Sequence, residues 1–143
     1  MPDEVIKQFH SAHQSILETI DQINSSIRSY REAKPKILEL QEKLLAHLGK
    51  QNDAFFYPLS KFYVNDRPSA KMLEFLQYDR RDMQVKLLVF FDRYSAEGGE
   101  ARAWSFPKDF TEFSKVLIGR IQVEKDFLLP LLTGFNPWEK GGE

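Results

Sequence analysis

Apolar residues recur at helical spacing along almost the whole chain. They follow a period of about 3.6 residues, with polar residues on the opposite side, which is the pattern of an amphipathic helix. No stretch between these segments shows the alternating pattern of a strand. The helical pattern covers four segments: residues 3–29, 35–57, 68–94 and 105–133.

The lengths of these segments predict how they are arranged. Helices of roughly 25 residues joined by short loops favour an antiparallel up-down-up-down four-helix bundle. We therefore expect an all-α fold, with the bundle over residues 1–135 and a flexible C-terminal tail over residues 136–143.

Capping and breaking residues predict the helix boundaries. Pro35 lies near the start of the second segment, and Pro58 should end or kink it. The sequence NDRPSAK (65–71) indicates a turn followed by a helix start. The sequence SAEGGEARAW (95–104) is typical of a surface loop, and Ser105 is the expected cap of the last helix.

Composition narrows the classes of function. The formal net charge is −1 and the basic residues are dispersed, which gives no electrostatic case for a nucleic-acid partner. The chain has no cysteine, so disulfides and thiolate metal sites are excluded. Without a signal-peptide core or an 18-residue apolar run, we expect no membrane association and a cytoplasmic location. We also expect no enzymatic activity, because no phosphate loop or local catalytic signature occurs.

Polar residues interrupt each of the four apolar stripes partway along. Taken singly, each has a structural explanation, such as a hydrogen-bonded core histidine or an i,i+4 surface ion pair. Taken together, they predict several charged groups buried at about the same height along the bundle axis. Such burial costs free energy unless the groups pair with one another or bind a ligand. The interrupting residues are His13 with His10 at the stripe edge, His47 and Gln51, Asp79, and Arg120 with Glu124.

The second and fourth segments contain a weak internal repeat. LLAHLGKQNDAFFYPL (44–59) aligns with LIGRIQVEKDFLLPLL (117–132), which places His47 over Arg120. The first copy has one extra residue before its proline. Such a repeat suits a bundle in which two helices contribute equivalent i,i+4 pairs to a central site.

Together with FHSAHQSIL and FLQYDRRDMQVKLLVFFDRYS, these two segments resemble a bacterial hemerythrin-like (HHE) domain over nearly the whole chain. The family pattern is a histidine in the first and third helices and His-x-x-x-Glu in the second and fourth. Tyr-Pro or Pro-Leu closes helices two and four. Members of full type hold two irons with five histidines and bridging carboxylates, and they bind or sense oxygen or handle iron. The resemblance implies a hemerythrin-like bundle.

The family's ligand positions are only partly matched in the first two helices. The first-helix ligand falls on His13 or His10. The second-helix histidine falls on His47, but Gln51 stands in place of its glutamate. With three histidines in the whole chain, a five-histidine di-iron site cannot form.

The match is weaker still in the last two helices. Asp79 is the residue nearest to the third-helix histidine, and Arg120 replaces the fourth-helix histidine beside Glu124. A guanidinium group has no lone pair for a metal. It supplies a fixed positive charge that can hold both carboxylates ionised.

These substitutions predict a metal-free polar cluster of Gln51, Asp79, Arg120 and Glu124 in the bundle centre. We expect no cofactor, or at most one weakly held iron or zinc ion. The ligands of that ion would be His13, His47 and Glu124, with His10 and Asp79 as further candidates.

Three functions follow as hypotheses. The first is a hemerythrin-like domain with a degenerate site that acts as a regulatory or protein-interaction module, with a protein partner or a second copy of the chain. The second is an iron-binding or oxygen- and redox-sensing protein with a reduced site. The third is an anti-sigma regulator, because KLLAHLGKQNDAFFYPL and FSKVLIGRIQVEKDFLL also resemble the Rsd/AlgQ family, which binds the main sigma factor of RNA polymerase.

Overall fold

A computed structural model describes residues 2–51, 55–94 and 100–134 of the chain. Within these ranges every regular element is a helix and no strand occurs, which confirms the all-α prediction. The long helices are α1 (Pro2–Ser25), α2 (Tyr30–Gln51), α4 (Arg67–Arg93) and α5 (Phe106–Val123). The shorter elements are α3 (Tyr57–Phe62), the 3₁₀ helix η2 (Glu100–Ser105), the π-helical turn η3 (Glu124–Leu128) and α6 (Leu129–Thr133).

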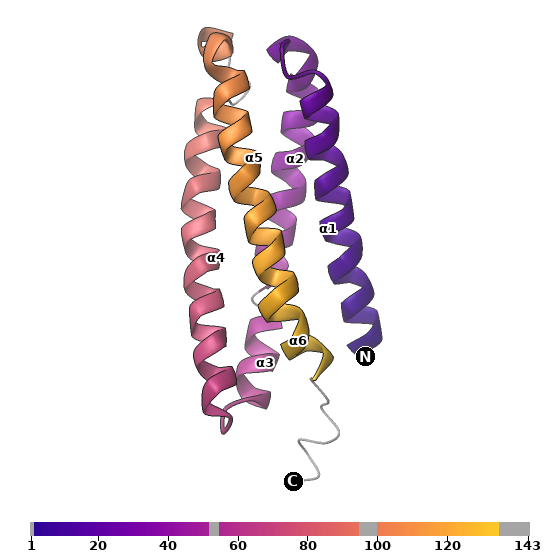
Figure 1. The fold of residues 1–143 in the computed structure, drawn as a ribbon, viewed down its shortest axis with the longest axis vertical. Coiled ribbons are helices and arrows are strands. Elements are labelled where there is room, and N and C mark those ends of the chain that lie inside the picture. Colours follow the sequence, from indigo (N-terminus) through magenta and orange to yellow (C-terminus); the bar gives the residue numbers. More distant parts are fainter. Residues whose placement is uncertain (1, 52–54, 95–99, 135–143) are drawn as a thin grey trace.

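The four long helices run along the long dimension of the molecule (Figure 1). The α1–α2 connection and the start of α5 lie at one end, and α3, α6 and the start of α1 lie at the other (Figure 1). α1 packs along α2, and η3 contacts both α5 and α4. None of the helices in the described residues has the length and hydropathy needed to cross a membrane.

The connection between α1 and α2 is shorter than the apolar pattern predicts. α1 ends at Ser25, and α2 begins at Tyr30, five residues before Pro35. The Ser29 hydroxyl accepts a hydrogen bond from the backbone N–H of Glu32 at 3.3 Å, as an N-cap does. The buried Tyr30 hydroxyl donates to the carbonyl of Tyr94 at 3.2 Å. A cap and a buried tyrosine therefore set this boundary, and Pro35 lies within the helix.

The other boundary predictions have mixed outcomes. Asp66 caps α4 by accepting from the Ser69 backbone N–H at 3.3 Å, as the turn signal predicts. Pro58 lies in the first turn of α3, so it begins a helix. The predicted loop over residues 95–104 is helical from Glu100 onward, and residues 95–99 lie outside the described part, as does the predicted tail at 136–143.

The end of the last helix is displaced by a π turn. α5 continues through η3 into α6, with Pro130 in the first turn of α6. Because a π turn closes i→i+5 hydrogen bonds, it shifts the inward face by one position. Leu132 is buried in consequence, whereas Leu131, which regular helical spacing after Leu128 would turn inward, is only partly buried.

The buried apolar side chains form two separate clusters. The larger includes Ile16, Leu48, Met83 and Leu117, and the smaller includes Phe9, Phe55, Leu76 and Leu128. On each of the four long segments a polar residue falls in sequence between members of the two clusters. These intervening residues are His13, Gln51, Asp79 and Glu124.

Leu87 and Leu88 test the orientation of α4, because the side chain of Leu87 is 1% exposed and that of Leu88 is 62% exposed. We expect Leu87→Ala to lower the free energy of unfolding by about 2–5 kcal/mol through lost burial and a cavity. Leu88→Ala, the matched control, should change it by less than about 0.5 kcal/mol. Urea denaturation followed by circular dichroism measures both, and equal losses would contradict the placement of α4.

Candidate functional site

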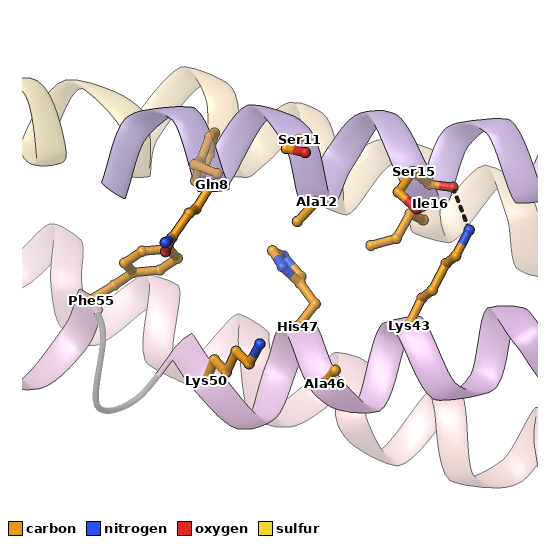
Figure 2. A pocket seen from close by; sticks show the side chains of 11 residues that line it. Gln8, Ser11, Ala12, Ser15, Ile16, Lys43, Ala46, His47, Lys50 and Phe55 are labelled. Atoms are coloured by element: carbon orange, nitrogen blue, oxygen red, sulfur yellow. Dashed lines mark hydrogen bonds between the residues drawn. The ribbon is translucent and has the colours of Figure 1, made fainter. Parts of the chain in front are cut away.

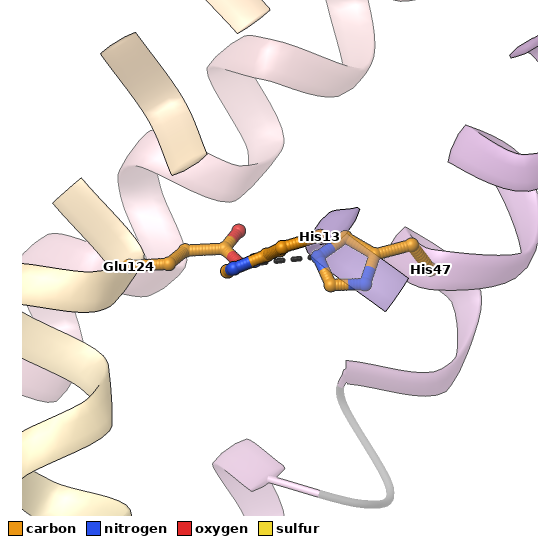
Figure 3. Close-up of side chains that lie close together, drawn as sticks. All are labelled: His13, His47 and Glu124. Atoms are coloured by element: carbon orange, nitrogen blue, oxygen red, sulfur yellow. Dashed lines mark hydrogen bonds and ion pairs between the residues drawn. The ribbon is translucent and has the colours of Figure 1, made fainter. Parts of the chain in front are cut away.

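The carboxylate of Glu124 lies at the centre of a buried polar cluster. Its side chain is 1% exposed. One oxygen, Oε1, lies 2.7 Å from Nε2 of His13 and 3.0 Å from Nε2 of His47 (Figure 3). The other oxygen, Oε2, accepts hydrogen bonds from Nε2 of Gln51 and Nε of Arg120, both at 2.9 Å. Glu124 therefore has four polar partners.

All four long segments contribute to this cluster. His13 comes from α1, His47 and Gln51 come from α2, and Arg120 lies one turn before Glu124 at the end of α5. Arg120 also donates to Asp79 of α4 through Nη1. The guanidinium group thus connects the buried carboxylate of Glu124 to the carboxylate of Asp79, whose side chain is 33% exposed.

The structure brings most of the predicted site residues together and leaves one out. His13, His47 and Glu124 converge, and Gln51, Arg120 and Asp79 join them by hydrogen bonds. His10 is exposed on the surface of α1, with its ring edge against Phe9. Of the two candidates in the first helix, His13 is therefore the one that faces the core.

Opposing effects act on the pKa of Glu124. Burial by itself raises this pKa, because it disfavours the charged form. The hydrogen bonds from His13 and His47, together with the charges of His47 and Arg120, outweigh burial. The pKa of Glu124 consequently lies well below its ordinary value, and the carboxylate is ionised at neutral pH.

Several polar atoms in the cluster have incomplete hydrogen bonding. Among the described residues, His13 Nδ1, Gln51 Oε1 and Arg120 Nη2 are buried without a hydrogen-bond partner. His47 Nε2 lies 3.0 Å from both Glu124 Oε1 and Gln51 Nε2. A neutral ring nitrogen carries either a proton or a lone pair, so it cannot donate to the first and accept from the second at once.

His13, His47 and Glu124 are the ligand types of a metal centre, and their ligand atoms lie within 4.8 Å of one another. Two ligands of a tetrahedral zinc ion lie about 3.4 Å apart, and adjacent ligands of an octahedral ion about 3.0 Å, when each is about 2.1 Å from the metal. The 2.7 Å between His13 and Glu124 is shorter than either value and is typical of a hydrogen bond. His13 Nδ1 also lacks, within the described chain, the orienting partner that metal-bound histidines usually have.

A pocket that the sequence did not predict lies beside His47. Its volume is about 490 Å³, and its walls come from α1, α2 and Phe55 (Figure 2). The available sequence signal is the pair of small residues Ala12 and Ala46, which leave the two helices without large side chains at this level. Because alanine is also a common filler of tight helix contacts, this signal alone does not distinguish a pocket from close packing.

Comparison with known proteins does not assign the chain to a family. No family model, no curated protein and no solved structure matches it. The hemerythrin-like resemblance therefore rests on the quoted segments and stays a hypothesis.

Glu124→Gln tests the electrostatic role of the carboxylate. Removing its charge leaves Arg120 buried beside a neutral group, and we expect a loss of about 3 kcal/mol in the free energy of unfolding at pH 7. Because the folded-state pKa is lowered, the stabilisation is fully present above the ordinary value of 4.5 and is lost as pH falls below it. The difference between wild type and variant should therefore shrink in acid.

Urea unfolding at a series of pH values measures that difference. Glu112→Gln, at an exposed position of α5, is the matched control and should differ from wild type by less than about 0.5 kcal/mol. A Glu124→Gln deficit that stays constant from pH 7 into strong acid would show that the charge of Glu124 has no stabilising role.

Proposed function

We propose that this chain is a hemerythrin-like domain in which an arginine has taken the place of the metal, and that it acts as a regulatory or protein-interaction module. The observation that carries the proposal is the Arg120–Glu124 pair, with Nε and Oε2 2.9 Å apart and both side chains buried. In the hemerythrin-like alignment, Arg120 stands in place of a metal-binding histidine, so its positive charge can compensate Glu124 as an ion would.

The contacts of Glu124 support a metal-free site. Its two oxygens are both engaged by hydrogen-bonding side chains, and a metal ion would have to displace some of them. Arg120 cannot move away cheaply, because it also pairs with Asp79 and its side chain is 6% exposed. A cation entering between His13 and Glu124 would meet the guanidinium charge at close range, where low dielectric strengthens repulsion.

The arrangement of the helices supports an antiparallel up-down-up-down bundle as the framework of this domain. The long helices lie side by side along the long dimension of the molecule, and the α1–α2 connection lies at the same end as the start of α5 (Figure 1). Each of them contributes a side chain to one polar layer, as expected for a bundle that is built around a central site.

An exposed apolar surface supports the interaction role. α4 turns Leu87 and Met83 inward, while the opposite side of the same helix carries large apolar side chains. Contiguous exposed apolar residues on a protein surface are typical of interaction sites. This α4 apolar face consists of Phe75, Tyr78, Val85, Leu88 and Val89, which are between 49% and 69% exposed.

A single metal ion on His13, His47 and Glu124 is the second candidate function. It is favoured by the convergence of two histidines and a carboxylate, and by the competing demands on His47 Nε2, which a metal bound to its lone pair would resolve. Such a site would suit zinc or iron(II). The anti-sigma alternative stays a prediction, for which purified sigma-factor region 4 is the direct test ligand.

Metal analysis separates the first two candidates. After anaerobic incubation with iron(II) or zinc and desalting, we expect far less than one ion per chain in the wild type, because Arg120 occupies the second oxygen of Glu124. The double variant Gln51→Glu with Arg120→His restores His-x-x-x-Glu spacing in both helices and should retain metal. Mass spectrometry of the metal content and near-ultraviolet absorption measure both.

Arg81→His with Gln84→Glu, on the exposed side of α4, is a control with the same change in composition. It should retain no more metal than the wild type. Retention of close to two irons by the wild type would contradict the proposal. Retention of one ion that is lost in His47→Ala would establish the second candidate.

The α4 apolar face predicts how partner binding responds to mutation. We expect Val85→Lys with Val89→Lys to abolish capture of a partner protein, or self-association, because two charges would have to be desolvated in the interface. Affinity capture with chemical cross-linking and sedimentation velocity provide the two readouts. Gln14→Lys with Thr111→Lys, which adds the same charge at exposed positions of α1 and α5, should leave both unchanged. Equal losses in both variants would argue against the α4 apolar face.

A further inference from the structure

The pocket between α1 and α2 has walls of two kinds. Its apolar lining includes the large side chains of Phe9, Ile16 and Phe55. The charged and titratable side chains that line it are Lys43, His47 and Lys50, and none of the lining residues is acidic. A volume of about 490 Å³ lies within the range of small-molecule sites, about 300–1,000 Å³.

The two lysines differ in what they are available to bind. Lys43 is already engaged, because its Nζ donates to Thr19 Oγ1 at 2.6 Å and to the Ser15 carbonyl at 3.3 Å (Figure 2) and lies 3.1 Å from a carboxylate oxygen of Glu39. Lys50 has no hydrogen bond or ion pair within the described parts of the chain. Among the described residues, Lys50 is therefore the positive charge at this pocket that has no partner.

His47 forms the polar end of the pocket. Its ring extends from α2 into the space between the helices (Figure 2), and its Nε2 is directed at Glu124. No hydrogen bond to its Nδ1 occurs within the described residues. Because Nε2 donates to the ionised Glu124, Nδ1 of the neutral ring carries a lone pair, so His47 contributes its ring to the pocket wall and no donor for an anion.

We propose that this pocket binds a small organic anion, namely a carboxylate carried on a compact apolar body. Lys50 supplies the charge that the carboxylate pairs with, and the aromatic and aliphatic wall buries the body. A single lysine fits a single negative charge better than a phosphate, for which proteins usually supply an arginine or several backbone N–H groups.

This site is distinct from the polar cluster and does not depend on whether that cluster holds a metal. His47 is the one residue that belongs to both. The His47 ring separates the pocket from Glu124. A carboxylate bound in the pocket can therefore affect the polar cluster through its contact with this ring.

The test uses chelator-treated protein and two probes of the same shape, 4-phenylbutyrate and its neutral amide 4-phenylbutyramide. Amide chemical shifts in ¹H–¹⁵N spectra follow the titration. We expect 4-phenylbutyrate to saturate with a dissociation constant of about 1 mM or tighter, which corresponds to about 0.3 kcal/mol or more per heavy atom. The shifts should concentrate at residues 11–16 and 43–50, and the neutral amide should bind about fivefold more weakly.

Two variants locate the site. Ala46→Phe fills the pocket from an exposed position of α2 and should weaken 4-phenylbutyrate binding at least tenfold. Leu45→Phe, at the preceding position and outside the pocket, should not weaken it. Lys50→Met should remove the preference for the anion over the amide, whereas Lys115→Met on α5 should keep it.

Three outcomes overturn the proposal. They are the absence of saturation by 4-phenylbutyrate up to about 10 mM, equal binding of the amide by the wild type, and binding that Ala46→Phe leaves unchanged. Because Ala46 and Lys50 are both exposed, neither substitution removes a core contact, and circular dichroism verifies that each variant keeps its helix content.

Discussion

A carboxylate buried among four helices has to be compensated by neighbouring groups, and the centre of this molecule is organised by that requirement. Glu124 is compensated by two histidines, a glutamine and an arginine that come from three different segments of the chain. The same requirement divides the apolar core, because the polar layer lies between two hydrophobic clusters. The position of this layer also ties the helices to a common register, since a shift of one helix by a single turn would leave a charge unpaired.

Arg120 gives this centre its particular character. In a metal protein the positive charge arrives with the ion and depends on its supply. Here it is part of the chain, and it joins Glu124 to Asp79 across the gap between α5 and α4. The π turn that begins at Glu124 contributes as well, because it adjusts the facing of the residues that follow so that Leu128 and Leu132 both reach the smaller apolar cluster.

The repeat of HLGKQ and RIQVE explains why part of the site could be found from the sequence. An i,i+4 spacing fixes two side chains on one helix face whatever the rest of the fold does, so His47 with Gln51 and Arg120 with Glu124 were predictable as pairs. Which of His10 and His13 joins them was not predictable. The two lie three residues apart, and only the rotation of α1 against its neighbours turns one inward and the other to solvent.

Spacing along a helix was enough to predict the helical class, the four long segments and the interruption of every apolar stripe by polar residues. It placed several ends wrongly, as at Tyr30, where a serine cap and a distant tyrosine carbonyl decide the boundary. Only the packed helices fix which oxygen of Glu124 each partner contacts, the exposed position of His10 and the pocket beside His47. Each of these depends on how the helices rotate and approach one another. Contacts between residues far apart in the chain set that rotation and approach.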